Sequence, residues 1–235
     1  MKKYTQEEFD VFEKDKHGRK ICPSGDYSNI KEFLTQCTFD DGCVFGDGCT
    51  FGIGISFNHR HSFGNNCVFG IYCRFGNNSD FGNGCEFDSE CYVSCNCVFG
   101  NGCEFGNGCK FGSTCVFGDG CNFNVWCDFG NECHFGYKCT FDICCVFGNE
   151  CDFDKECKVE KDIVLLDFLK FEGFGSESRC TYFFKHPEGI YIRCGCFHGT
   201  IEEFRNKVQK THMNNKYAQG YLKIADLAEW QFNDN

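Results

Sequence analysis

The chain has 235 residues and a formal net charge of −11, with 30 Phe, 28 Gly and 24 Cys against 2 Pro and 2 Met. This charge argues against direct binding to nucleic-acid phosphates or to anionic lipid, and so biased a composition indicates internal repetition. Residues 1–20 are polar and lack the apolar run of a signal peptide or membrane span. We therefore expect a cytoplasmic protein without membrane contact, in which most thiols are not cross-linked.

Residues 1–36 are predicted to form an N-terminal cap. The motif Thr-Gln-Glu-Glu that begins at Thr5 matches a capping box and predicts a short helix over residues 7–12. A Pro-Ser-Gly-Asp stretch then leads toward the repeat. Such a cap would cover the first coil, whose unpaired strand edge is otherwise open to association.

Residues 37–162 consist of 21 six-residue repeats without an insertion. Position one is Cys in 18 of them, and position three is Phe in all but two. The exceptions are Ile55, His61 and Ser79 at position one and Val93 and Val159 at position three. Apolar residues two apart predict a strand with one face inward, and the Gly, Asn or Asp that follows predicts a tight turn. Each repeat is therefore expected to form one short strand and one corner.

The phase of this repeat resembles that of hexapeptide-repeat proteins: a small residue, any residue, a large apolar residue, then Gly, Asp or Asn. Their fold is a left-handed parallel β-helix in which three repeats make one triangular coil. The resemblance thus implies a mainly β protein with about seven coils from Cys37 onward. Ile21, Tyr27 and Phe33 share the six-residue phase of Phe39, which predicts that the register begins earlier.

Three Phe and three Cys per coil are expected to point inward and form columns along the helix axis. We interpret the Cys columns as small apolar packing, and expect neither a metal nor a cofactor. A metal or redox ladder of thiols is the alternative, although an entry path and a mixed nitrogen and sulfur ligand set are missing from the pattern. Disulfides between coils are a third interpretation that distance alone allows.

The net charge of the protein lies entirely on the repeat. Residues 37–162 hold 7 Lys and Arg and 18 Asp and Glu, while the rest of the chain holds 16 of each. Of the three outward faces, one is least charged near its centre, where Val98 and Val116 fall on adjacent coils. This face is our candidate for self-association.

The most polar irregularity within the repeat is the segment that contains His59, Arg60 and His61. His61 takes a column position that is normally Cys and is expected to point inward, whereas His59 and Arg60 belong to a corner and should face solvent. The simpler interpretation is a tolerated substitution with a hydrogen-bonded imidazole. A binding or catalytic role for these three residues is the alternative.

The six-residue rhythm ends in residues 163–235. Residues 179–185 and 190–194 are predicted to be the strands of a hairpin around a His-Pro-Glu-Gly turn. A second capping box at Thr200 predicts a helix, an Asn-Asn pair ends it, and another amphipathic helix follows. We expect a small ββαα unit.

Cys194, Cys196 and His198 place three soft ligands within a short stretch of this C-terminal unit. A single Cys-x-Cys lacks the second spaced pair that is typical of zinc sites. A buried Cys at the end of a strand is the simpler interpretation, and we predict no metal site here.

The whole chain resembles a group of uncharacterised bacterial and bacteriophage proteins with Cys-x-Phe-Gly repeats. The shared features are a Thr-Gln-Glu-Glu-Phe head, a Lys-Ile-Cys-Pro-Ser-Gly-Asp-Tyr stretch, and a tail with Ile-Arg-Cys-Gly-Cys-Phe-His-Gly-Thr. The resemblance implies the architecture and an origin in a bacterium or a phage-infected host cell. It brings no known activity.

We therefore expect a non-enzymatic structural or interaction protein, an acidic β-helix that forms a homo-oligomer or binds a protein partner. The alternative is a phage-derived inhibitor or decoy that mimics nucleic-acid charge or binds a small ligand, and acts on a host or defence protein. A third candidate is an acyltransferase, since many hexapeptide-repeat proteins have that activity. Those enzymes carry a projecting loop beside a catalytic His, and the 21 uninterrupted repeats offer no such loop.

Overall fold

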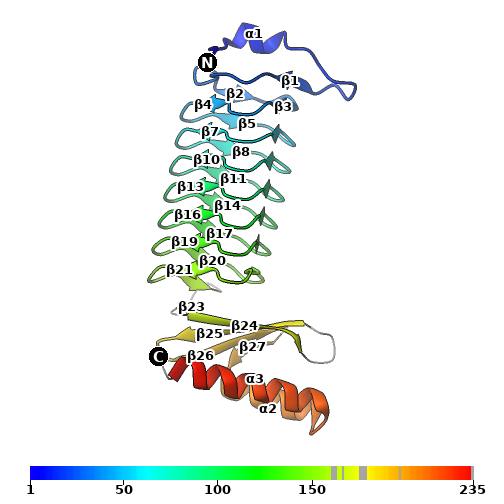
Figure 1. Cartoon of the computed structure of the whole chain (residues 1–235), viewed down its shortest axis with the longest axis vertical. Helices are drawn as coiled ribbons and strands as arrows, with labels where there is room; N and C mark the ends of the chain where they lie inside the picture. Colours follow the sequence, from blue (N-terminus) through cyan, green and yellow to red (C-terminus); the bar gives the residue numbers. More distant parts are fainter. Residues whose placement is uncertain (160–162, 166, 175–178, 196, 234–235) are drawn as a thin grey trace. The chain divides into compact units, whose positions relative to one another are not determined.

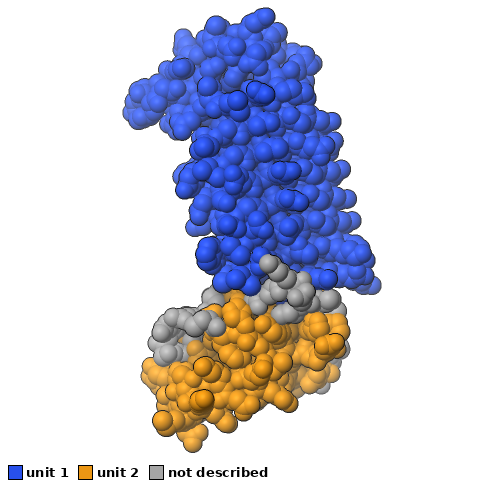
Figure 2. Space-filling model, turned by 180° about the vertical axis from the view of Figure 1, so that it is seen from behind, with its two compact units in different colours: residues 1–161 blue, residues 162–235 orange. Residues whose placement is uncertain are grey.

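The computed structural model describes residues 1–159, 163–165, 167–174, 179–195 and 197–233. The chain divides into two compact units, Met1–Lys161 and Asp162–Asn235, called unit 1 and unit 2 below (Figure 2).

Unit 1 is a parallel β-helix, as the repeat predicted, with about eight coils whose short strands are stacked into three sheets (Figure 1). Sheet 1 contains β1 (Lys20–Cys22), β3 (Cys37–Phe39), β6 (Ser56–Phe57), β9 (Arg74–Phe75), β12 (Tyr92–Val93), β15 (Lys110–Phe111) and β18 (Asp128–Phe129). Sheet 2 contains β4 (Val44–Phe45), β7 (Ser62–Phe63), β10 (Asp80–Phe81), β13 (Val98–Phe99), β16 (Val116–Phe117), β19 (His134–Phe135) and β21 (Asp152–Phe153). Sheet 3 contains β2 (Glu32–Phe33), β5 (Thr50–Phe51), β8 (Val68–Phe69), β11 (Glu86–Phe87), β14 (Glu104–Phe105), β17 (Asn122–Phe123), β20 (Thr140–Phe141) and β22 (Lys158–Val159).

The first coil is one residue shorter than the others. Phe81 pairs with Phe63 and with Phe99, each 18 residues away, so a regular coil spans 18 residues. In the first coil Cys22 pairs with Phe39, which is 17 residues later. The prediction that Ile21 shares the phase of Phe39 is therefore wrong: Ile21 is exposed and Cys22 takes the buried place. Because this segment pairs like the repeat that follows, the helix has about one coil more than the seven predicted from Cys37 onward.

The interior of unit 1 is a continuous stack of aromatic rings. Within one column, the rings of Phe63 and Phe81 lie 4.8 Å apart and almost parallel, and the rings of Phe81 and Phe99 lie 4.7 Å apart. Rings of neighbouring columns meet edge to face, as with Phe63 and Phe69 at 5.1 Å and 90°. Both arrangements are favourable for aromatic pairs, so they add specific geometry to a large buried apolar area.

The N-terminal helix α1 (Gln6–Asp10) begins at the predicted capping box. Thr5 and Glu8 cap each other reciprocally, since each accepts a hydrogen bond from the backbone N–H of the other. Phe9 is buried, and its ring meets that of Phe33 edge to face at 5.1 Å. The helix thereby covers the aromatic column at its first ring.

Unit 2 contains one short strand, β23 (Ile163–Val164), then a four-stranded antiparallel sheet and two helices. The strands of the sheet are β24 (Asp167–Phe174), β25 (Arg179–His186), β26 (Gly189–Cys194) and β27 (Phe197–Thr200). The helices are α2 (Ile201–His212) and α3 (Lys216–Asn233). The predicted hairpin is β25 and β26, and both predicted helices are present. The ββαα prediction missed two strands of the sheet, β24 and β27.

The sequences of the two missed strands, β24 and β27, do not favour a strand by themselves. β24 contains Gly173 and a register irregularity, and β27 is four residues long with Gly199 inside it. Glycine weakens a strand by itself, so the hydrogen bonds to β25 and β26 decide these segments. The core between sheet and helices includes Phe183, Ile192 and Phe204.

None of the helices in the described part of the chain combines the length and the apolar character that crossing a membrane requires.

Candidate functional site

The inward thiols of unit 1 are hydrogen-bond donors to the corners of the preceding coil. Cys85 Sγ donates to the carbonyl oxygen of Gly64, and Cys103 Sγ to that of Gly82, both at 3.4 Å. The same contact, to a carbonyl 21 residues earlier, recurs in all three columns. A thiol is small enough for the column and can also donate a hydrogen bond to an inward carbonyl oxygen. An Ala side chain at the same position could not donate this hydrogen bond.

These thiols are poorly suited to nucleophilic or metal chemistry. Burial raises the pKa of the Cys43 thiol to about 11, and the loss of solvation in a buried site disfavours a charged thiolate. Among the residues that the structure describes, no three His, Cys, Asp or Glu side chains are grouped so that they could hold a metal ion. The packing interpretation of the columns accounts for their geometry.

A ladder of side-chain oxygens runs along the corner that follows sheet 2. The backbone N–H of Asn83 donates to Asn65 Oδ1 at 2.8 Å, and that of Asn101 donates to Asn83 Oδ1 at 2.8 Å. Asp47 and Asp119 continue the ladder at its two ends. Sequence reasoning missed this feature, although Asn or Asp at position five in every third repeat would have indicated it.

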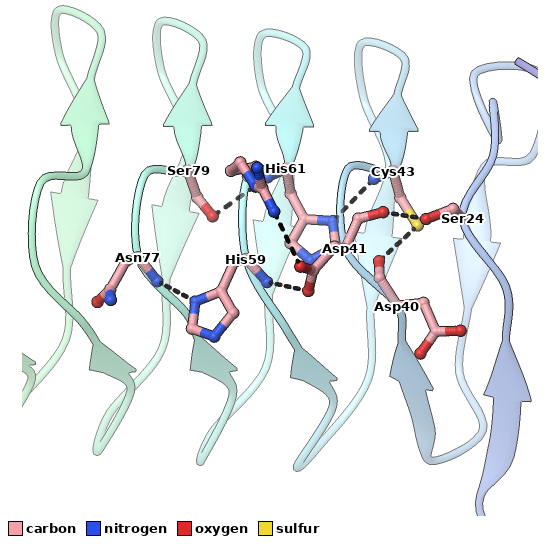
Figure 3. Close-up of polar contacts among 9 residues, drawn as sticks. Ser24, Asp40, Asp41, Cys43, His59, His61, Asn77 and Ser79 are labelled. Carbon is pink, nitrogen blue, oxygen red and sulfur yellow. Dashed lines mark hydrogen bonds and ion pairs between the residues drawn. The ribbon is translucent and has the colours of Figure 1, made fainter.

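His59 takes the equivalent place in a second ladder, at the corner that follows sheet 1 (Figure 3). Its backbone N–H donates to Asp41 Oδ1 at 3.1 Å, and its Nδ1 accepts from the backbone N–H of Asn77 at 2.9 Å. Arg60 Nη2 lies 3.3 Å from Asp41 Oδ2 on the exposed surface. Both side chains face solvent as predicted, and His59 replaces an Asn as a corner acceptor.

His61 lies in the interior, 1% exposed, between Cys43 and Ser79 in the same column (Figure 3). Its Nδ1 accepts a hydrogen bond from the backbone N–H of Cys43 at 3.2 Å. The ring proton therefore sits on Nε2, which has no hydrogen-bond partner among the described atoms. Burial lowers the pKa of His61 to about 4, so at neutral pH the imidazole is an uncharged part of the core.

The aromatic interior surrounds the free N–H of His61. Its ring lies 5.6 Å from the ring of Phe57, 6.1 Å from that of Phe63 and 6.3 Å from that of Phe45. The site is closed to solvent, and a catalytic base needs contact with a substrate. The geometry thus favours the structural interpretation of His61 over the catalytic one.

In unit 2 the structure separates two of the predicted soft ligands. Cys194 pairs with Phe197 and Arg193 pairs with His198 across β26 and β27. Because neighbouring residues of a strand point to opposite faces, Cys194 and His198 lie on opposite faces of the sheet. Cys194 packs against the helix side and accepts a hydrogen bond from Thr181 Oγ1 at 3.2 Å. Cys196 lies outside the described residues.

Two hollows open to solvent were not predicted. One, of about 470 Å³, lies in unit 2 at the β25–β26 turn and the start of α2, and its polar lining includes His186, Glu188 and Glu202. The other, also about 470 Å³, crosses the outer face of sheet 3, where Glu86 and Glu104 are neighbours in register. Both are acidic, and neither is enclosed enough to exclude water from a reaction.

Val98 and Val116 are neighbours on the outer face of sheet 2, as predicted. They are 44% and 39% exposed, and the flanking outward positions on this sheet are Asp80 and His134. The apolar pair is therefore small and bordered by polar side chains.

Fold and surface define a parallel β-helix repeat protein whose 18-residue coils are filled by columns of Phe and Cys. Comparisons of the chain with protein-family models, with curated proteins and with solved structures found no match.

Proposed function

We propose that the protein is a non-enzymatic interaction scaffold, a rigid acidic β-helix whose outer surface binds a second copy or a protein partner. The observation that carries the proposal is the division of each repeat into an inward pair, usually Cys and Phe, and outward residues that vary from coil to coil. The inward pair is buried except at Phe153, which is half-buried. A constant interior with a variable exterior is typical of repeat proteins that present a binding surface.

Rigidity supports the same proposal. The corner ladders join each coil to the next by backbone and side-chain hydrogen bonds, and the stacked rings fill the interior. A surface that is ordered before binding loses less conformational entropy on association than a flexible one.

The molar mass in solution, measured by light scattering over a series of concentrations, tests self-association. We expect the mass of an oligomer, that is, two or more times the 26.8 kDa of one chain. The double variant V98K/V116K examines the face of sheet 2. T38K/T50K is the control, because it adds the same charge at outward positions of sheets 1 and 3. A monomer at every concentration would remove self-association from the proposal, and turnover in a thioester acyl-transfer assay would overturn it.

Charge favours a second candidate, an inhibitor or decoy that occupies a nucleic-acid-binding protein. All of the net charge of −11 lies on residues 37–162, and an acidic rod presents negative potential to a basic cleft. The resemblance to bacteriophage proteins supports this candidate, with the bacterial cytoplasm as its expected location. Competition with duplex DNA for a basic DNA-binding protein, abolished at high salt, is the expected result.

A further inference from the structure

The corner that follows sheet 3 forms a ridge of exposed apolar side chains on unit 1. From coil to coil its two outermost positions hold Ile53 with Gly54, Ile71 with Tyr72, Ser89 with Glu90, Asn107 with Gly108, Val125 with Trp126, and Ile143 with Cys144. Backbone hydrogen bonds stack these corners, from Tyr72 N to Ser89 O and from Trp126 N to Ile143 O, both at 3.2 Å. We call this column of corners the apolar ridge.

The aromatic residues of the apolar ridge do not serve the fold. Tyr72 and Trp126 are 56% and 64% exposed, and each has a φ of +62°. At the sixth position of the 21 repeats Gly is the commonest residue, with seven occurrences. Gly84, in the corner that follows sheet 2, has a φ of +64°, a left-handed conformation that is unfavourable for a residue with a side chain. Large rings at strained, exposed positions are typical of contact residues.

The apolar ridge has the same pattern when it is read from either end. Two polar coils at its centre are flanked on each side by a coil with an aromatic residue and then by a coil with Ile. A two-fold axis midway between the coils of Glu90 and Gly108 would place Tyr72 of one copy against Trp126 of the other. The same axis would place Ile53 against Ile143. An interface with this symmetry is self-complementary.

The outward residues of sheet 1 beside the ridge complete this symmetry with charge. They follow one another in register as Arg74, Tyr92, Lys110 and Asp128, and all four are exposed. The same two-fold axis places Arg74 opposite Asp128 and Tyr92 opposite Lys110. Each dimer would then have two ion pairs and two cation–π pairs at its rim.

We propose that two copies of the chain associate antiparallel along the apolar ridge, with Tyr72 against Trp126 and Arg74 against Asp128. This inference rests on the self-association in the proposed function and names its surface. On the sheet 3 side the same geometry brings Glu86 near Glu104 of the second copy. That like-charge contact opposes the dimer and keeps it dependent on salt and protein concentration.

Exchange of the rim charges tests the pairing. R74E and D128R each place like charges opposite one another, and we expect each to raise the dimer dissociation constant at least about tenfold. A mixture of the two variants is expected to form a heterodimer, since both rim pairs are then of opposite charge. Light scattering of each variant and of the mixture gives the masses. D80R, on the outward face of sheet 2, is the control for a charge reversal away from the ridge.

The outcomes separate the ridge from the proposed function. Variants that are monomeric alone and dimeric when mixed establish the ridge pairing, because a misfolded variant would not be rescued by mixing. If wild type is dimeric and R74E leaves it so while V98K/V116K dissociates it, the ridge is overturned and self-association through sheet 2 stands. If wild type is monomeric at all concentrations, the ridge pairing and self-association both fail, and binding of a different protein partner is the part of the proposed function that stands.

A spectroscopic measurement adds an independent test. Trp126 and Trp230 are the only two Trp residues, so the variant W230F isolates the ridge ring. On dilution through the dissociation constant, the emission of Trp126 is expected to shift to longer wavelength as the ring is exposed to water. E86Q/E104Q should move the midpoint of this change to lower concentration. An unchanged spectrum in a dimer that dissociates would overturn the ridge pairing.

Discussion

Asn65 Oδ1 accepts a hydrogen bond from the backbone N–H of Asn83, and the two atoms lie 2.8 Å apart. Asn83 is 18 residues later in the sequence, one coil further along the helix. Asn83 does the same for Asn101. The ladder satisfies corner N–H groups that have no strand partner, and each rung links neighbouring coils.

Removal of one rung should weaken unit 1 measurably. We expect N83A to lower the free energy of unfolding by about 1 kcal/mol, because the N–H of Asn101 loses its acceptor. N107A, at the same repeat position of the ridge corner, is the matched control. Chemical denaturation followed by circular dichroism measures both. Equal stability of N83A and N107A would show that solvent replaces the rung without loss.

The thiol columns should resist modification in the folded protein. Among the cysteines whose side chains the structure describes, Cys95, Cys144 and Cys194 are partly exposed and the others are buried. These three are expected to react before the buried ones with a maleimide at neutral pH. Thiols of the columns should react only after unfolding, since they are buried. Mass spectrometry of labelled peptides follows each site. Rapid labelling of Cys85 or Cys103 in native buffer would contradict the packing interpretation.

Stability should depend on pH through His61. Burial lowers the pKa of His61 to about 4 in the folded state, against about 6.5 in an unfolded chain. The unfolded state therefore binds a proton first as pH falls. This contribution is fully present above pH 6.5 and is lost on acidification to pH 4, by about 3 kcal/mol in total.

The variant H61C tests that prediction because it restores the usual residue of the column. We expect H61C to be at least as stable as wild type at pH 7 and to lose about 3 kcal/mol less between pH 7 and pH 4. Carboxylates contribute equally to both proteins, so the difference isolates the imidazole. Parallel stability curves for the two proteins would refute a role for His61.

Arg205 should stabilise the helical layer of unit 2. Its guanidinium on α2 lies 2.6 Å from Glu229 and 2.7 Å from Asp226, both on α3. We expect R205A to lower the free energy of unfolding of this unit by about 1 kcal/mol, and by less at high salt. K223A on the exposed side of α3 is the control. Thermal unfolding in low and high salt gives the comparison.

Much of the fold and part of the candidate surface could be predicted because the repeat is strict. Cys and Phe two residues apart allow only one inward face, and a period of six allows only one succession of strand and corner. The same periodicity placed Val98 beside Val116 and turned His61 inward. The hydrogen-bond ladders were missed because each rung joins residues 18 apart in different coils, a contact that no short pattern contains.

The sequence by itself determined the parallel β-helix, the buried columns and the position of the helices, since local periodicity and capping chemistry specify each of them. Only the tertiary structure decided that Cys22, not Ile21, is buried in the first coil, and that Asp167–Phe174 and Phe197–Thr200 are strands. It also decided that Cys194 and His198 lie on opposite faces. These features depend on pairing between segments that are distant in the sequence. The register of two paired strands is set by contacts between them, so neither segment determines it alone.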